Sequence, residues 1–185
     1  MYRFSAMRSI LFFDTDITMS RLVNLVFMAL VFLVSTAQAQ PDYDKKLSSI
    51  YRKTVKTIQP NEVVKSMVNN ASVILLDIRT AAEFEVSHLP GARFLNYDSY
   101  TNVDLIAIPK DSKVIVYCSV GYRSERVGEK LIELGYKNVF NIYGGIFEWK
   151  NEGFEVVNKL NQRTDSVHTY NRNWSKWLVR GIKVY

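Results

Sequence analysis

The chain has 185 residues and a formal net charge of +6, from 24 Lys and Arg against 18 Asp and Glu. The excess is uneven, because residues 158–185 hold six basic residues and one acidic residue, whereas residues 40–157 hold fifteen of each. The basic balance therefore belongs to the tail and gives no indication of a nucleic-acid partner. The single cysteine excludes a disulfide within the chain.

Residues 1–39 do not have the pattern of a folded segment. Residues 22–34 are almost wholly apolar, Arg21 precedes them, and the sequence AQA follows at 37–39. A basic residue, a short apolar run and a small-x-small site are typical of a secretory signal peptide. The run is shorter than the ~20 residues that a membrane-spanning helix needs. We therefore expect an exported protein, periplasmic or secreted, that begins at Gln40; an N-terminal membrane anchor is the alternative.

Residues 40–56 are polar and charged without a clear period, which is typical of a leader or linker. Apolar runs and helical periods then alternate. They predict helices over residues 60–70, 80–86, 124–134 and 146–151, and strands over 72–76, 93–97, 113–117 and 138–142.

Alternation of strands and helices predicts an α/β fold, with a parallel sheet and helices on both faces. Such sheets bind ligands at the carboxyl ends of their strands. Cys118 comes directly after the strand predicted over residues 113–117, and a helix follows. The loop that begins at Cys118 is therefore the candidate site of chemistry.

This loop has three features that favour a thiolate at Cys118. The backbone N–H groups of Ser119 to Ser124 can form a cradle for an anion, and the following helix begins with a partial positive charge. Arg123 adds a full positive charge, and Gly121 lets the backbone bend tightly. The alternative is an ordinary turn between a strand and a helix, with a buried cysteine.

Four motifs occur in order along residues 57–157. They are LDIRTAAEF at 76–84, SHLPGA at 87–92, the loop CSVGYRS at 118–124, and YGGIFEW at 143–149. In this order and spacing they resemble the motifs of a single rhodanese domain. The resemblance implies a sheet of about five strands within this segment, followed by a C-terminal extension over residues 158–185.

The resemblance implies a sulfurtransferase. The cysteine of the family takes a sulfane sulfur from a donor such as thiosulfate, holds it as a persulfide, and passes it to cyanide or a thiol. Covalent catalysis of this kind divides one transfer into two easier steps and needs no metal and no cofactor. Cys118 is then the catalytic residue, and the substrate-binding residues are those of the loop: Ser119, Val120, Gly121, Tyr122, Arg123 and Ser124.

The other motif residues are expected to support the structure. Asp77, Arg79 and Glu83 are expected to fix the loop after the first buried strand, with Arg79 paired to a carboxylate. His88 precedes Pro-Gly in a turn and is expected to be structural rather than a catalytic base.

Two alternative functions stay open. Related cysteine phosphatases use a C-x5-R loop, whereas Cys118 to Arg123 forms C-x4-R, which makes a smaller cup. A non-enzymatic module for sulfur carriage or protein interaction is the other alternative, although inactive domains of the family usually lack the cysteine that this chain keeps.

The extension over residues 158–185 contains Trp174, Trp177 and Leu178 at helical spacing, and Gly181 is expected to end that helix. We expect these side chains to dock on the domain, because they would otherwise expose a large apolar stripe. The alternative is a basic, aromatic surface that meets a transient protein partner, an anionic surface or the sulfur donor.

Overall fold

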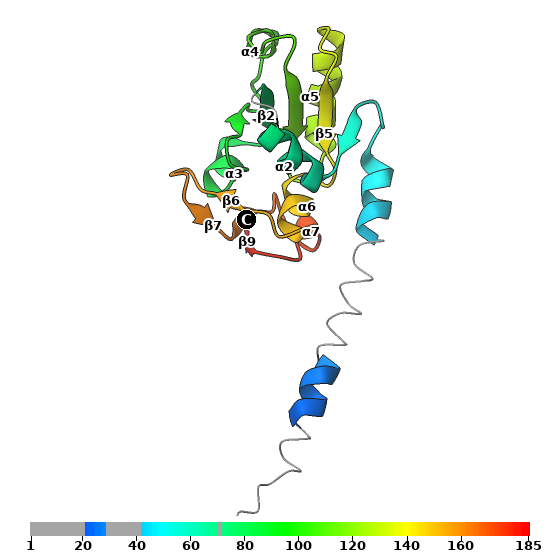
Figure 1. Cartoon of the computed structure of the whole chain (residues 1–185), viewed down its shortest axis with the longest axis vertical. Helices are drawn as coiled ribbons and strands as arrows, with labels where there is room; N and C mark the ends of the chain where they lie inside the picture. The colour runs from blue at the N-terminus through cyan, green and yellow to red at the C-terminus, as the bar shows by residue number, and fades with distance from the viewer. Residues whose placement is uncertain (1–20, 29–41, 70–71) are drawn as a thin grey trace, which may run out of the picture. The chain divides into compact units, whose positions relative to one another are not determined.

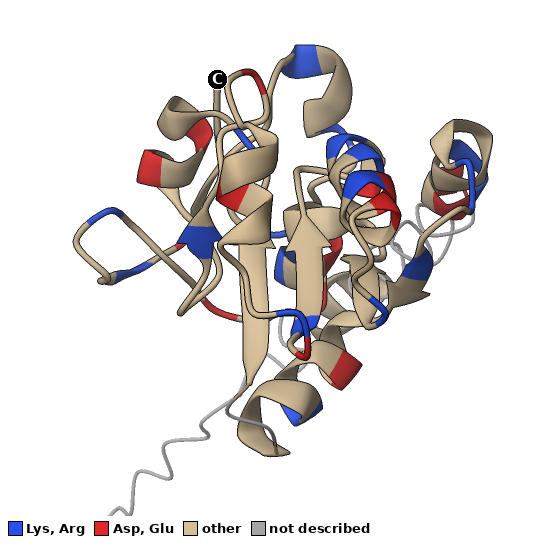
Figure 2. Ribbon diagram, turned by 90° about the horizontal axis from the view of Figure 1, so that it is seen from above, with Lys and Arg blue, Asp and Glu red and all other residues tan. Residues whose placement is uncertain are grey.

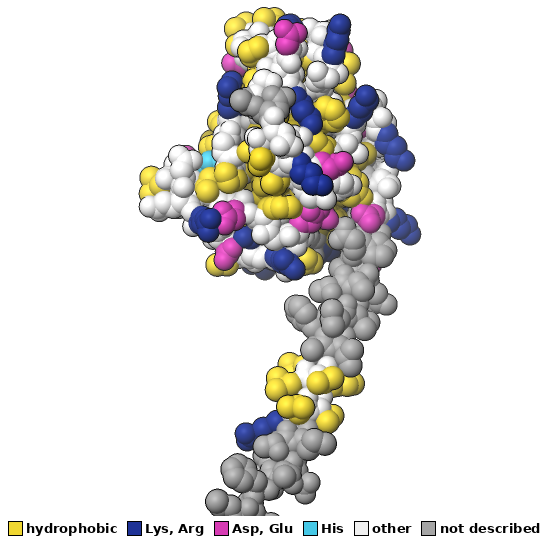
Figure 3. Space-filling view, in the orientation of Figure 1, with side chains coloured by type: hydrophobic (Ala, Val, Ile, Leu, Met, Phe, Trp, Pro, Cys, Tyr) yellow, Lys and Arg dark blue, Asp and Glu magenta, His cyan; other side chains and the backbone are white. Residues whose placement is uncertain are grey.

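A computed structural model describes residues 21–28, 42–69 and 72–185 (Figure 1). Residues 21–28 form a helical segment with exposed apolar side chains (Figure 3). No helix within the described residues combines the length and the apolar character that crossing a membrane requires. The cleavage site predicted at residues 37–39 lies outside the described residues, so the signal peptide and the anchor both stay predictions.

The centre of the domain is a five-stranded parallel sheet. Its strands lie in the order β1-β5-β4-β2-β3, and each neighbouring pair is parallel. The bounds are β1 Lys56–Ile58, β2 Val73–Asp77, β3 Arg93–Phe94, β4 Lys113–Tyr117 and β5 Val139–Ile142. The predicted parallel α/β fold is confirmed; β1 was not predicted, and β3 is shorter than expected.

The sheet is buried on both faces, as the continuous apolar runs predict. Along β4, Ile115 and Tyr117 belong to one core cluster, whereas Val114 and Val116 belong to a second. Successive side chains of a strand point to opposite faces, so the two clusters lie on opposite sides of the sheet.

Helices cover both faces. The first core cluster contains residues from the helix at 42–50, from α2 (Pro60–Asn69) and from α6 (Gly145–Asn151). The second contains residues from α4 (Asn102–Ile106) and α5 (Tyr122–Glu133). The short α3 (Ala81–Val86) follows β2 and starts with a capping box between Thr80 and Glu83.

The expectation of a linker over residues 40–56 is corrected by the structure. Residues 42–50 form a helix, and its side chains Tyr43 and Leu47 are 2% and 0% exposed. Ile50 and Tyr51 pack against the same cluster. These four positions have the i, i+4, i+7, i+8 spacing of an apolar helix face. This period was not detected in the sequence because most of the neighbouring residues are polar or charged.

The extension docks on the domain, as expected. Leu178 is fully buried, and the Trp177 ring stacks on Tyr43 with 5.3 Å between the ring centres. The expected helix is shorter, because α7 spans Arg172–Ser175 and ends before Trp177 and Leu178. The extension forms two small sheets: its β7 (Arg163–Thr164) pairs with the preceding β6 (Val156–Val157), and its β8 (Ser166–His168) pairs with β9 (Ile182–Val184).

Candidate active site

Cys118 lies one residue beyond β4, where the chain leaves the sheet toward α5. It is 1% exposed. The N–H group of Gly121 donates a hydrogen bond to its Sγ atom, with 3.2 Å between nitrogen and sulfur. The loop therefore curls back onto the sulfur, and of the predicted cradle of amides from Ser119 to Ser124 the structure shows the hydrogen bond from Gly121.

Gly121 is required by its backbone and by its surroundings. Its φ of +93° is left-handed, and it caps the N-terminus of α5. A Cβ atom at this position would overlap the hydroxyl group of Tyr51. Helix α5 begins at Tyr122, two residues earlier than predicted, because the left-handed Gly121 ends the loop directly before it. Arg123 therefore belongs to the first turn of the helix.

The rear of the loop is held by residues far away in the sequence. The Tyr51 hydroxyl donates to the carbonyl of Val120 at 2.7 Å and accepts from the N–H of Gly144 at 3.1 Å. The N–H of Ile146 donates to the carbonyl of Cys118 at 2.9 Å. A Cβ atom at Gly145 would collide with this same carbonyl. The glycine pair thus lets the start of α6 approach the Cys118 loop.

Arg123 is paired with Glu83, and it also interacts with the Cys118 sulfur. Its Nη1 and Nη2 atoms donate to the two carboxylate oxygens at 2.9 and 2.7 Å. Nη2 also donates to Ser119 Oγ at 3.1 Å, and this hydroxyl donates to Glu83 at 2.8 Å. Glu83 therefore does more than fix the loop after β2, since it neutralises the charge of Arg123 and positions Ser119.

The protonation state of Glu83 follows from these contacts. Burial alone would raise the pKa of its carboxyl group, but the hydrogen bonds and charge of Arg123 outweigh burial and lower the pKa to about 2. Burial likewise opposes the charge of Arg123, and the bonds to Glu83 hold the pKa of its guanidinium above the ordinary value. The pair is therefore ionised across the physiological range.

Asp77 and Arg79 form a second, fully buried ion pair. Arg79 donates from Nε and Nη2 to the carboxylate of Asp77 at 2.8 and 2.6 Å, and both side chains are 0% exposed. Nη2 also donates to the carbonyl of Ser87 at 2.5 Å. The prediction that Arg79 pairs with a carboxylate is confirmed. The pair ties the end of β2 to the segment after α3.

His88 is also placed as a structural residue. Its ring stacks on Phe84 with 3.8 Å between the centres, and its Nδ1 atom lies 3.0 Å from the carbonyl of Phe84. Its backbone pairs with Val157. His88 is 4% exposed and does not line the pocket at Cys118.

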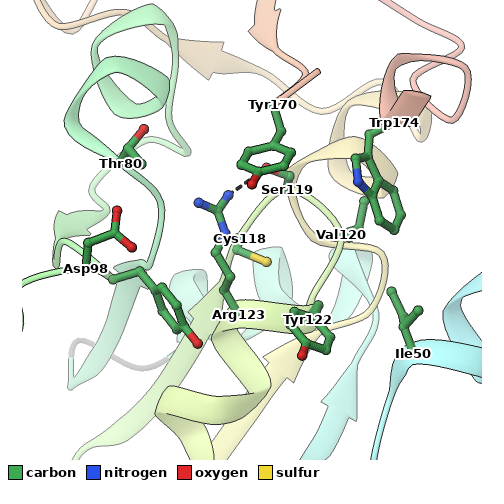
Figure 4. A pocket seen from close by; sticks show the side chains of 11 residues that line it. Ile50, Thr80, Asp98, Cys118, Ser119, Val120, Tyr122, Arg123, Tyr170 and Trp174 are labelled. Atoms are coloured by element: carbon green, nitrogen blue, oxygen red, sulfur yellow. Dashed lines mark hydrogen bonds between the residues drawn. The ribbon is translucent and has the colours of Figure 1, made fainter. Parts of the chain in front are cut away.

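A pocket of about 530 Å³ opens above Cys118 (Figure 4). Four predicted loop residues line it with the cysteine: Ser119, Val120, Tyr122 and Arg123. The two others support the loop: Gly121 bonds to the sulfur, and the buried Ser124 donates to Asn141 at 2.7 Å.

Sequence reasoning did not place the rest of the lining at Cys118, although contact of the aromatic extension with the donor was one of its alternatives. This part of the lining consists of Ile50, Thr80, Tyr97, Asp98, Tyr170 and Trp174. Trp174 and Ile50 lie on one side of the sulfur, and Thr80 and Asp98 lie on the other (Figure 4). Thr80 directly follows Arg79 in a recognised motif, and Trp174 was singled out as part of an apolar face. Their meeting at Cys118 depends on tertiary structure.

The fold and the site define an α/β domain with a cysteine loop at the carboxyl edge of a parallel sheet. A family model described as "Rhodanese-like domain" matches residues 60–152. A sulfurtransferase of Allochromatium vinosum is 33% identical over 103 residues, covering 56% of this chain and 95% of that protein. The chain therefore belongs to the rhodanese-like family, and its relatives support sulfur transfer in general.

Other similarities cover the same domain. The adenylyltransferase and sulfurtransferase UBA4 of Meyerozyma guilliermondii is 38% identical over 92 residues, 46% of this chain. This chain spans only 22% of that protein. A rhodanese-like domain protein of Staphylococcus aureus has a solved structure with a TM-score of 0.50 and 27% identity, covering 56% of this chain and 98% of that one.

Proposed function

We propose that this protein is a sulfurtransferase that carries a sulfane sulfur on Cys118. The observation that supports this most is the position of the Cys118 sulfur, at a pocket, bonded to the amide of Gly121 at 3.2 Å. Amide donors and the N-terminus of α5 stabilise negative charge on sulfur. The persulfide, like the thiolate, carries that charge.

The reaction has two steps. The Cys118 thiolate attacks the outer sulfur of a donor such as thiosulfate; a sulfur–sulfur bond forms, and sulfite leaves with the electron pair of the broken bond. An acceptor such as cyanide or a thiolate then attacks the outer sulfur of the persulfide. The new product leaves, and the Cys118 thiolate is restored. No metal or organic cofactor takes part in either step.

The alternatives gain less support. A phosphatase would use its arginine to clamp phosphate, whereas Arg123 is held by both oxygens of Glu83. A sulfur-carrier module without turnover would share the first step.

A protein partner for the extension stays open as a proposal, as does export to the periplasm or outside the cell. Acidic and basic residues are both spread over the domain, and we propose no nucleic-acid partner (Figure 2).

The mass of Cys118 tests the proposal. We expect the intact protein to gain one sulfur atom on incubation with thiosulfate or a thiosulfonate and to lose it on addition of cyanide, with thiocyanate released. The variant Cys118→Ser should fold normally and gain no sulfur, since the change is nearly isosteric. Failure of every donor to load the wild-type protein would refute the proposal. Sulfur gain that neither cyanide nor thiols remove would also contradict the proposal, because the outer sulfur of a persulfide is transferred to both.

A further inference from the structure

The pocket above Cys118 is shaped by segments outside the family match. Tyr170 and Trp174 come from the C-terminal extension and Ile50 from the helix at 42–50, whereas the family model matches residues 60–152. Tyr97 and Tyr122 bring the number of aromatic side chains that line the pocket to four. Its volume of about 530 Å³ is in the range that suits organic ligands rather than a small inorganic anion.

The pocket offers little positive charge. Among the described residues that line it, the charged side chains are Arg123 and Asp98. The guanidinium of Arg123 is paired with Glu83, and the Tyr170 ring lies over it at 5.3 Å. Lys46, whose ammonium lies 5.3 Å from the Trp174 ring centre, is not a lining residue. A dianionic donor such as thiosulfate would therefore meet an exposed carboxylate and a single cation, which is already shared between Glu83 and the Cys118 sulfur.

The backbone of Tyr170 gives an independent indication. Its φ of +64° is left-handed, which is rare for a bulky residue and costs roughly 1–3 kcal/mol. The turn is held by its neighbours: the N–H of Tyr170 donates to His168 Nδ1 at 3.1 Å, and the N–H of Thr169 donates to the carbonyl of Val184 at 2.8 Å. The fold thus holds a tyrosine ring over the site at a conformational cost, although its side chain is 56% exposed.

We propose that this pocket selects a monoanionic sulfane donor with a flat, apolar body, which packs against Tyr170 and Trp174. The inference rests on the proposed function of Cys118. For a thiosulfonate, the Cys118 thiolate attacks the terminal sulfur, the bond between that sulfur and the sulfonyl sulfur breaks, and a sulfinate leaves with the electron pair. An organic persulfide reacts in the same way and releases its thiolate.

Three donors separate charge from shape: thiosulfate, methanethiosulfonate and benzenethiosulfonate. The rate at which each loads Cys118 is measured by intact mass in single-turnover experiments with the full chain. Each rate is divided by the rate of the same donor with free cysteine, which removes differences in leaving group. We expect benzenethiosulfonate to exceed methanethiosulfonate by at least about tenfold, and thiosulfate to be the slowest.

The variant Tyr170→Gly tests the role of the Tyr170 ring separately from any effect on folding. Glycine adopts a φ of +64° without strain, so the variant should melt no lower than the wild type, yet lose most of the preference for the aromatic donor. Tyr170→Phe should keep the preference. Lys53→Gly is the matched control, because Lys53 also has a positive φ, of +59°, and does not line the pocket. It should leave all three rates unchanged.

The outcomes are distinguishable. If no donor loads Cys118, the proposed function is wrong and this inference falls with it. If all donors load it equally well, or if thiosulfate is fastest, sulfur transfer stands and the inference is overturned. A preference for the aromatic donor that survives in Tyr170→Gly would overturn the role of this ring.

Discussion

At the scale of single residues, the pairing of Arg123 with Glu83 changes the picture of the loop. The sequence suggests a free cation beside the sulfur, whereas the structure shows a bidentate ion pair that also binds Ser119. The glutamate is 40 positions away from the arginine in the sequence. The loop is therefore held through the first turn of α5, and Arg123 serves Glu83 as well as the Cys118 sulfur.

The pair makes stability depend on pH. The pKa of Glu83 falls from 4.5 to about 2 in the folded protein, so the stabilisation is fully present above about pH 4.5 and is lost as the pH falls toward 2. We expect the substitution Glu83→Gln to lower the free energy of unfolding by about 2–3 kcal/mol at pH 7. The difference from the wild type should shrink at pH 3, as measured by urea unfolding at both pH values.

Glu85→Gln is the matched control for this prediction. Glu85 belongs to the same helix α3, and its ion pair with Lys159, at 3.7 Å, is exposed on both sides. Surface pairs of this kind contribute roughly 0–1 kcal/mol. An equal loss in both variants, or no dependence of the difference on pH, would contradict the assigned role of Glu83.

At the scale of elements, the helix at 42–50 and the residue after it belong to the site. Tyr51 connects this helix to the Cys118 loop and to the start of α6 through its hydroxyl group. A strand-to-helix loop has backbone groups without partners in the sheet, and here one tyrosine binds one such group in each of two loops, β4 to α5 and β5 to α6. The position of the loop thus depends on an element that precedes the family's motifs.

Tyr51→Phe should weaken this connection. Removal of the hydroxyl leaves the carbonyl of Val120 and the N–H of Gly144 without that partner, at a cost of about 1–3 kcal/mol in the free energy of unfolding. We also expect slower sulfur loading of Cys118, measured by intact mass. Tyr122→Phe, at a side chain that is 46% exposed, serves as the stability control. Equal unfolding curves for the two variants would argue against the link.

At the scale of the whole molecule, the extension is part of the domain and not an appended tail. Leu178 and Val167 are fully buried in the first core cluster, beside residues from β4 and α6. The same segment carries Tyr170 and Trp174 to the pocket. Packing of the extension and shaping of the site are therefore coupled.

Leu178→Ala should lower the free energy of unfolding by about 2–5 kcal/mol, because it opens a cavity in a packed core. Val179→Ala is the neighbouring control, since Val179 is 54% exposed. Thermal melting of the two variants checks this. If the extension packs weakly, both variants will melt with the wild type, and its role would then be confined to binding.

The mature protein is expected to begin at Gln40. This prediction rests on the apolar run at 22–34 and the AQA sequence at 37–39. Intact mass of protein recovered from the exported fraction of expressing cells would test it. Retention of residues 22–34 in a membrane fraction would support an anchor instead.

The sequence by itself determined the buried strands β2, β4 and β5, the place of Cys118 after β4, and the family's motifs. These are local features, since a continuous apolar run or a glycine at a turn acts through neighbouring residues. Only the tertiary structure decided that Glu83 neutralises Arg123, that Tyr51 supports the loop, and that Tyr170 and Trp174 complete the pocket. Contacts between residues 40 or 69 positions apart depend on how the elements pack around the sheet, and no local sequence pattern predicts them.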